Sequence, residues 1–103
     1  MKRRVIWSND ALDELGDVLE FLAQDDLTVA LGIIDKIEAA GNQLGAHATG
    51  RPGRMAHTFE KSLPKLRYII AYSVDDDQAD GVITILHVIH SARQWKKGTW
   101  PKP

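Results

Sequence analysis

The chain contains no cysteine. Disulfide bonds and thiolate metal sites are therefore excluded, and the composition fits the reducing cytoplasm. Long hydrophobic runs are missing as well. No long apolar segment follows the basic residues at the N-terminus, and no window reaches the roughly 20 apolar residues of a membrane-spanning helix. These absences predict a soluble, cytoplasmic protein without a membrane partner.

Net charge is also small, at −1, but the two parts of the chain differ in charge. Residues 1–46 hold 4 basic and 9 acidic residues, whereas residues 47–103 hold 9 basic residues, 5 acidic residues and all four histidines. This asymmetry allows either a local anion-binding surface or an ordinary scatter of solvated charges. The length of 103 residues and the 44% hydrophobic content predict one globular domain over residues 1–103.

Two runs rich in β-branched and aromatic residues, residues 66–74 and 82–90, stand out in the chain, and an acidic segment ending at Gly81 joins them. This pattern predicts a β-hairpin. The second run is apolar on both faces, which is typical of a central strand. Its expected faces are Ile83, Ile85 and Ile89 on one side and Val82, Leu86 and Val88 on the other.

Two amphipathic helices are expected between a short strand at residues 3–7 and the hairpin. Ser8 suits the N-cap of a helix that runs to about residue 23, and a second helix begins near residue 27 or 28 and stops at Gly45. Gly32 and Gly41 lie inside the second helix, where they allow close packing of the two helices. The acidic residues of the first helix lie mostly off its apolar stripe and are expected to be solvated; they are Asp13, Glu14, Asp17 and Glu20.

The helical pattern is lost at residue 46. Gly50, Pro52 and Gly53 predict a loop, and Arg51 and Arg54 flank these residues. Neither glycine-rich nucleotide motif is present, so the loop is either an ordinary basic connector or a grip on a polyanion backbone. Residues 58–63 are predicted to form an edge strand, and residues 96–103 a flexible tail.

The order of these elements, β-α-α-β-β-β, predicts an α+β fold in which an antiparallel helical hairpin covers one face of a small antiparallel sheet. Four segments in this order resemble the RelE/ParE family of bacterial toxins: Trp7-Ser8, GRPGR at residues 50–54, RYIIAY at residues 67–72, and ILHVIHSARQW at residues 85–95. The resemblance implies a toxin of a type II toxin–antitoxin pair, which a cognate antitoxin holds inactive by wrapping around it.

The family divides by target. RelE-like members enter the ribosome and cleave mRNA, whereas ParE-like members poison DNA gyrase and cleave nothing. The predicted topology brings basic and imidazole groups together, which favours a metal-independent, ribosome-dependent endoribonuclease without cofactors. The alternatives are a ParE-like gyrase inhibitor and an inactive member that only forms the antitoxin complex.

Cleavage of RNA requires a base for the ribose 2′-hydroxyl, an acid for the leaving oxygen and cations for the phosphorane. The resemblance assigns Arg67 to the phosphate and His90 to acid or base chemistry. Arg93 matches a C-terminal basic position that both branches of the family share, and the three could converge on one phosphate. Glu60 is either a base, as in some relatives, or the ion-pair partner of Arg54 or Arg67. The remaining basic candidates would contact nucleic acid; they are Arg51, Arg54, Lys61, Lys65, Lys96 and Lys97.

Two departures from the RelE pattern count against the nuclease and leave it nearly level with the gyrase alternative. Glu60 stands in the strand where RelE carries a lysine-rich site, and Trp95 lies where a catalytic tyrosine would be expected, although an indole cannot donate a phenolic proton. His87, among apolar neighbours, is predicted to be a packed or hydrogen-bonded residue. His47 and His57 have no metal-binding spacing.

Overall fold

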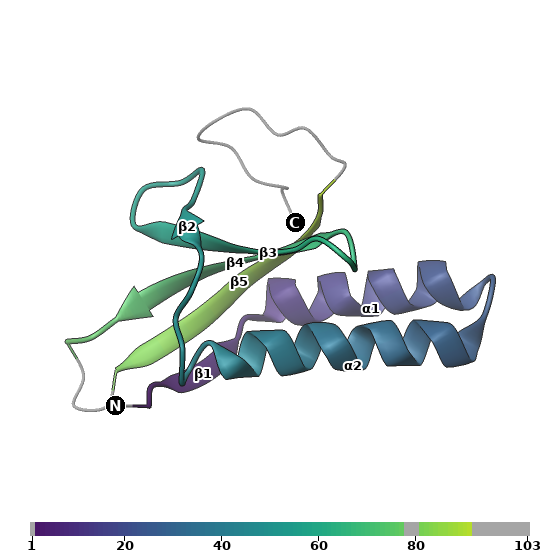
Figure 1. Cartoon of the computed structure of the whole chain (residues 1–103), viewed down its shortest axis with the longest axis horizontal. Helices are drawn as coiled ribbons and strands as arrows, with labels where there is room; N and C mark the ends of the chain where they lie inside the picture. The colour runs from purple at the N-terminus through teal and green to yellow at the C-terminus, as the bar shows by residue number, and fades with distance from the viewer. Residues whose placement is uncertain (1, 78–80, 92–103) are drawn as a thin grey trace.

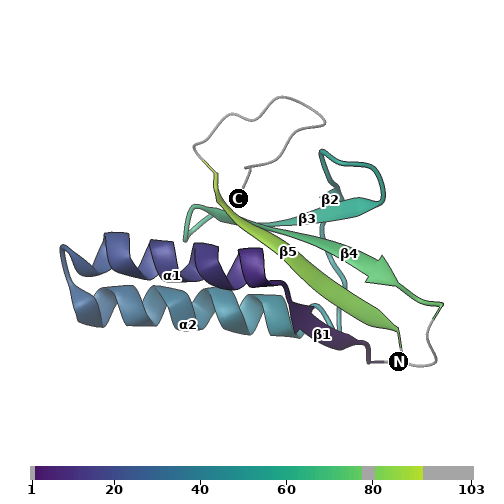
Figure 2. The same cartoon turned by 180° about the vertical axis from the view of Figure 1, so that it is seen from behind.

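The computed structural model describes residues 2–77 and 81–91, in which two helices lie on one face of a five-stranded sheet (Figures 1 and 2). The elements are β1 (Arg4–Trp7), α1 (Asn9–Ala23), α2 (Leu27–Gln43), β2 (Arg51–Pro52), β3 (Thr58–Leu63), β4 (Tyr68–Asp75) and β5 (Val82–His90). The predicted α+β architecture with a helical hairpin is thereby confirmed. Arg93, Trp95, Lys96, Lys97 and the predicted tail at residues 96–103 lie outside the described residues.

Both helices begin at side-chain caps. The Ser8 hydroxyl accepts a hydrogen bond from the Ala11 N–H at 3.0 Å, as predicted, and the Asp26 carboxylate caps α2 through the Val29 N–H at 3.1 Å. These bonds satisfy N–H groups that have no partner within the first turn of a helix. Neither helix is long and apolar enough to cross a membrane, and they are the only helices in residues 2–77 and 81–91.

The sheet has the strand order β1-β5-β4-β3-β2. The hairpin of β4 and β5 is antiparallel, and β5 is a central strand, as predicted. The prediction of a wholly antiparallel sheet is corrected at one edge, because β1 pairs with β5 in parallel. The sheet also contains the two-residue strand β2, which was predicted to be part of a loop. This strand pairs with Phe59 and Glu60 of β3.

A β-bulge changes the faces of β5. Ala71 lies opposite His87 whereas Tyr72 lies opposite Ile85, so Leu86 is an extra residue without a partner on β4. Because alternation restarts after the bulge, Val88 joins Ile85 in the core beneath the helices. The prediction that Ile89, rather than Val88, shares a face with Ile83 and Ile85 is therefore wrong.

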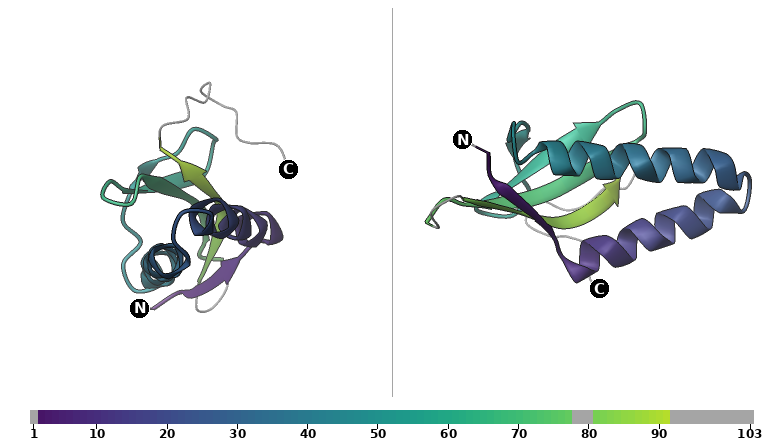
Figure 3. Two further views of the ribbon diagram at one scale, coloured as in Figure 1. Left: turned by 90° about the vertical axis from the view of Figure 1, so that its right-hand side faces the viewer. Right: turned by 90° about the horizontal axis from the view of Figure 1, so that it is seen from below.

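The core lies between the helices and the face of the sheet that carries Tyr68, Ile70 and Tyr72. The helical hairpin extends well beyond the sheet at the end where α1 joins α2 (Figures 1 and 3). Gly41 permits a close approach of the Trp7 indole rather than the expected packing against α1: a Cβ at residue 41 would lie 2.5 Å from Trp7 Cζ2. No atom outside α2 lies within 4 Å of a Cβ built at Gly32, so close packing does not account for that glycine.

Candidate functional site

Arg67 and His90 lie together at one end of the sheet. Arg67 closes the turn between β3 and β4 with a positive φ of 65°, a conformation that is uncommon outside glycine. The Ser91 N–H donates to the Arg67 carbonyl oxygen at 2.9 Å, and His90 lies opposite Tyr68 in the ladder of β4 and β5. The rings of Tyr68 and His90 meet edge to face, with 5.2 Å between their centroids. This sheet end therefore fixes the imidazole next to the turn that carries Arg67.

Glu60 lies elsewhere, in a buried cluster with two arginines. Its side chain is 3% exposed. The Arg54 N–H donates to Glu60 Oε2 at 3.0 Å, and Arg54 Nε lies 3.3 Å from the same oxygen. Arg51 Nη2 is 3.8 Å from Glu60 Oε1. The sequence left open whether Glu60 is a base or an ion-pair partner, and the structure shows an ion pair with Arg54. Arg51, which was predicted only to contact nucleic acid, lies beside the same carboxylate.

Of the candidate catalytic residues that the structure describes, Glu60 lies apart from His90 and Arg67. Glu60 pairs with Ala71 on β4, and His90 pairs with Tyr68 three residues away, so their backbones are separated by one intervening strand and three residues. At about 4.8 Å per strand and about 3.3 Å per residue, this places them roughly 14 Å apart. Side chains three residues apart on a strand also point to opposite faces, so Glu60 and His90 cannot contact one small substrate group.

The other basic candidates are scattered over the surface. Arg51 and Lys65 are exposed, and Arg54 is largely covered. Lys61 is half-buried on the helix side of β3, in a small hollow of about 240 Å³ that is also lined by Gln43, the last residue of α2, and by His47 beyond it. Beside this hollow, the buried Tyr72 hydroxyl donates to the Thr49 carbonyl oxygen at 2.6 Å, and burial raises the pKa of this phenol.

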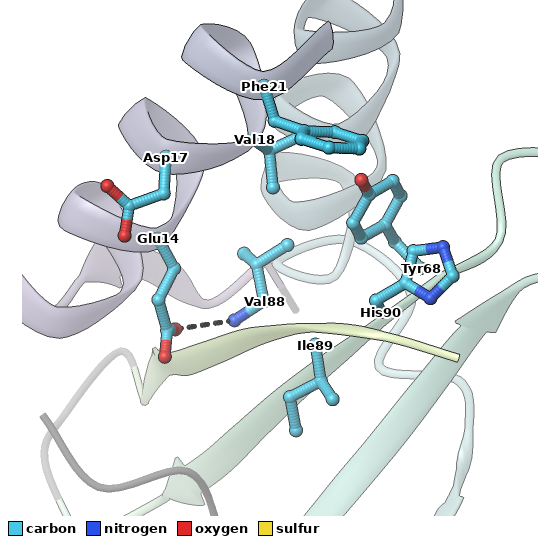
Figure 4. A pocket seen from close by; sticks show the side chains of 8 residues that line it. All are labelled: Glu14, Asp17, Val18, Phe21, Tyr68, Val88, Ile89 and His90. Atoms are coloured by element: carbon cyan, nitrogen blue, oxygen red, sulfur yellow. Dashed lines mark hydrogen bonds between the residues drawn. The ribbon is translucent and has the colours of Figure 1, made fainter. Parts of the chain in front are cut away.

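A larger pocket of about 490 Å³ opens between α1 and the ends of β4 and β5 (Figure 4). The carboxylates of Glu14 and Asp17 lie on one side, and the rings of Tyr68 and His90 on the other. Phe21 lies over the pocket, while Val18 and Val88 separate the two sides. Sequence reasoning missed this pocket, although Glu14, Val18 and Phe21 follow a helical spacing of four and three residues that places them on one face of α1.

Glu14 corrects the expectation that the acidic residues of α1 are all solvated. Its Oε1 accepts a hydrogen bond from the Val88 N–H at 2.9 Å, and its Oε2 lies 3.0 Å from His87 Nδ1. The ladder of β1 and β5 ends at Trp7 and Ile85, so β1 offers no partner to the Val88 N–H. The Glu14 carboxylate accepts this hydrogen bond instead. His87 is hydrogen-bonded, as predicted.

Comparison with known proteins identifies the family. Residues 5–95 match the family model described as "ParE toxin of type II toxin-antitoxin system, parDE". The chain belongs to the ParE toxin family. Membership confirms the expected RelE/ParE-type toxin and implies a cognate antitoxin as its partner.

One known protein and two solved structures are also similar to this ParE family member. The chain is 33% identical over 95 residues to a Sinorhizobium fredii (strain NBRC 101917 / NGR234) protein named "Putative toxin Y4kP", and the match covers 91% of this chain and 94% of that protein. Among solved structures, a chain of the chromosomal ParDE toxin–antitoxin system from P. aeruginosa superposes with a TM-score of 0.76 at 17% identity, covering 86% of this chain and 96% of the other. The YoeB/ParE toxin from Agrobacterium tumefaciens gives 0.56 at 14% identity, covering 84% and 97%. These two structures share the fold.

Proposed function

We propose that this ParE family toxin arrests growth by binding and inhibiting DNA gyrase, without an active site of its own. The placement of Glu60 and His90 carries this proposal. General acid–base cleavage of RNA requires both groups within hydrogen-bonding reach of one reacting phosphate ester. These two side chains point to opposite faces of the sheet, so they do not form such a pair.

The environment of Glu60 gives further support. Its carboxylate is 3% exposed and already accepts the Arg54 N–H, with guanidinium groups of Arg54 and Arg51 beside it. A base that abstracts a ribose proton has to reach its substrate. Glu60 instead holds the loop that carries β2 against β3, which is a structural role.

The groups proposed to contact gyrase or its DNA are exposed cations on the edge strand β2 and in the turn between β3 and β4. Arg51 on β2 and Lys65 and Arg67 in the turn between β3 and β4 are exposed. Cations on a surface attract an anionic target over roughly 8 Å at physiological ionic strength. Lys65→Glu is expected to weaken inhibition and to reduce its dependence on salt, with Arg4→Glu, at an exposed cation of β1, as the charge-matched control.

Purified components test the proposal. The toxin is titrated into a gyrase supercoiling reaction and, separately, into ribosomes programmed with mRNA. We expect loss of supercoiling or accumulation of cleaved DNA, intact mRNA, and the same gyrase inhibition by His90→Gln, because the imidazole does no chemistry. Cleavage of mRNA by the wild type that His90→Gln abolishes would refute the proposal, and silence in both reactions would favour an inactive member.

Ribosome-dependent mRNA cleavage is the second candidate, and one observation favours it. Arg67 and His90 share one end of the sheet, joined by the bond from the Ser91 N–H to the Arg67 carbonyl oxygen. A cation and an imidazole at one place are two of the three groups required for phosphoester cleavage. The ribosome reaction above therefore includes Arg67→Gln beside His90→Gln.

A further inference from the structure

The pocket between α1 and the ends of β4 and β5 has the chemistry of a cation site. Carboxylates of Glu14 and Asp17 line one side, and aromatic rings of Tyr68 and Phe21 line other sides (Figure 4). Aromatic faces attract a cation through their quadrupole, most strongly where water is partly excluded. Val18 and Val88 add an aliphatic surface between the two sides, against which the stem of a long basic side chain can pack.

Asp17 and Phe21 are the groups that a ligand can reach. Asp17 is exposed and forms neither a hydrogen bond nor an ion pair within the part of the chain that the structure describes. Phe21 is 69% exposed, the largest exposure among the large hydrophobic residues described. By contrast, the Glu14 carboxylate is engaged with Val88 and His87, so it lends charge to the pocket while staying in place.

The helical hairpin as a whole also favours a cationic partner. Residues 9–43, which form the helical hairpin, contain nine acidic residues and one basic residue. Leu12, on α1, and Leu27 and Val29, at the start of α2, are also at least half exposed. A partner that covers this hairpin therefore needs apolar side chains together with positive charge, because an acidic partner would be repelled.

We propose that this pocket receives an arginine side chain of the cognate antitoxin, with its guanidinium between the Asp17 carboxylate and the rings of Phe21 and Tyr68. Arginine fits better than lysine because its planar group stacks on a ring while it donates two parallel hydrogen bonds to a carboxylate. The inference rests on family membership, which implies an antitoxin, and is independent of whether the toxin's target is gyrase.

The first experiment measures the affinity of the antitoxin encoded beside this toxin for three toxin variants. Asp17→Arg and Phe21→Ala are each expected to raise the dissociation constant at least about tenfold, as anchors of an interface do. Asp13→Arg is the matched control, since Asp13 is an exposed acid on the same helix that does not line the pocket. Equal losses for Asp17→Arg and Asp13→Arg would reduce the effect to general charge and overturn the proposal.

A second experiment identifies the arginine. Each arginine and lysine of the antitoxin is replaced in turn by glutamine and tested against wild-type toxin and against Asp17→Asn. One arginine is expected to lose affinity with the wild type and to lose little more with Asp17→Asn, because the two changes remove the same contact. If a lysine shows this coupling, or if no basic residue does, the assignment to arginine is wrong.

Growth separates this pocket from the target-binding surface. Cells that express Asp17→Arg toxin are expected to stop growing as the wild type does, and co-expressed antitoxin is expected to fail to rescue them. Loss of toxicity in a variant that still binds the antitoxin would assign the pocket to the target and overturn the proposal. The proposed gyrase target can fail its own assay without changing either result.

Discussion

Replacing Gly41 and Gly32 by alanine should change stability in opposite directions. Both glycines lie inside α2, where alanine is favoured over glycine by about 1 kcal/mol. At Gly32 no atom lies within 4 Å of the added Cβ apart from the helix itself, so Gly32→Ala should gain that amount in full. The free energy of unfolding is then expected to rise by about 1 kcal/mol.

At Gly41 the added Cβ would lie 2.5 Å from Trp7 Cζ2 and 2.7 Å from Trp7 Cη2. Carbon atoms prefer separations of roughly 3.5–4.0 Å, so the indole has to move by about 1 Å. Overpacking of this kind costs about 1–3 kcal/mol. The movement also strains the 2.9 Å hydrogen bond from Trp7 Nε1 to Asn42 Oδ1, which is worth about 1 kcal/mol. After the gain in helix propensity, a net loss of about 1–3 kcal/mol remains.

Urea unfolding of the two variants and the wild type, monitored by circular dichroism, measures both effects under one set of conditions. The transition midpoints of Gly32→Ala and Gly41→Ala should lie on opposite sides of the wild type at an unchanged slope. A Gly41→Ala protein that is as stable as Gly32→Ala would refute the close approach of Trp7 to α2. It would also remove the packing reason for a glycine at that position.

Three further perturbations follow from the hydrogen bonds and charges. Glu60→Ala should lower the free energy of unfolding by about 2–3 kcal/mol, because it leaves the Arg54 N–H and guanidinium without their acceptor. Urea unfolding measures this loss, and an unchanged stability would contradict the buried ion pair. Ser8→Ala should cost about 1–2 kcal/mol in the same assay, since the hydroxyl both caps α1 and donates to the Leu86 carbonyl oxygen. The hydrogen bond from Arg3 holds the pKa of Asp76 below its ordinary 3.8, so this contribution to stability is present above pH 3.8 and is lost as the pH falls through the lower folded-state pKa. Asp76→Asn should remove that part of the acid sensitivity, which unfolding curves at pH 7 and pH 3 compare.

The sequence was informative where structure depends on local chemistry. The Ser8 cap, the two amphipathic stripes and the antiparallel pairing of β4 with β5 all rest on residues close together in the chain, and the structure has them. The apolar composition of residues 82–90 also predicted a central strand correctly. Such features follow from propensity and periodicity, which a single sequence displays.

The features that the sequence did not predict depend on residues far apart in the chain. The parallel pairing of β1 with β5 follows from how the helical hairpin packs, and the bulge at Leu86 is held by the Ser8 hydroxyl, 78 residues away. Glu14 resembled its solvated neighbours because nothing local marks it as the partner of Val88. The separation of Glu60 from His90 is another such case, since residue order does not reveal the face on which each side chain lies.

Pulse labelling tests the proposed action on gyrase most directly. The chain is expressed without its antitoxin, and incorporation of labelled thymidine and labelled amino acid is followed over the first minutes. We expect DNA synthesis to fall first while protein synthesis continues. Collapse of amino-acid incorporation before thymidine incorporation would contradict the account and direct attention to Arg67 and His90 as parts of a ribosome-dependent nuclease.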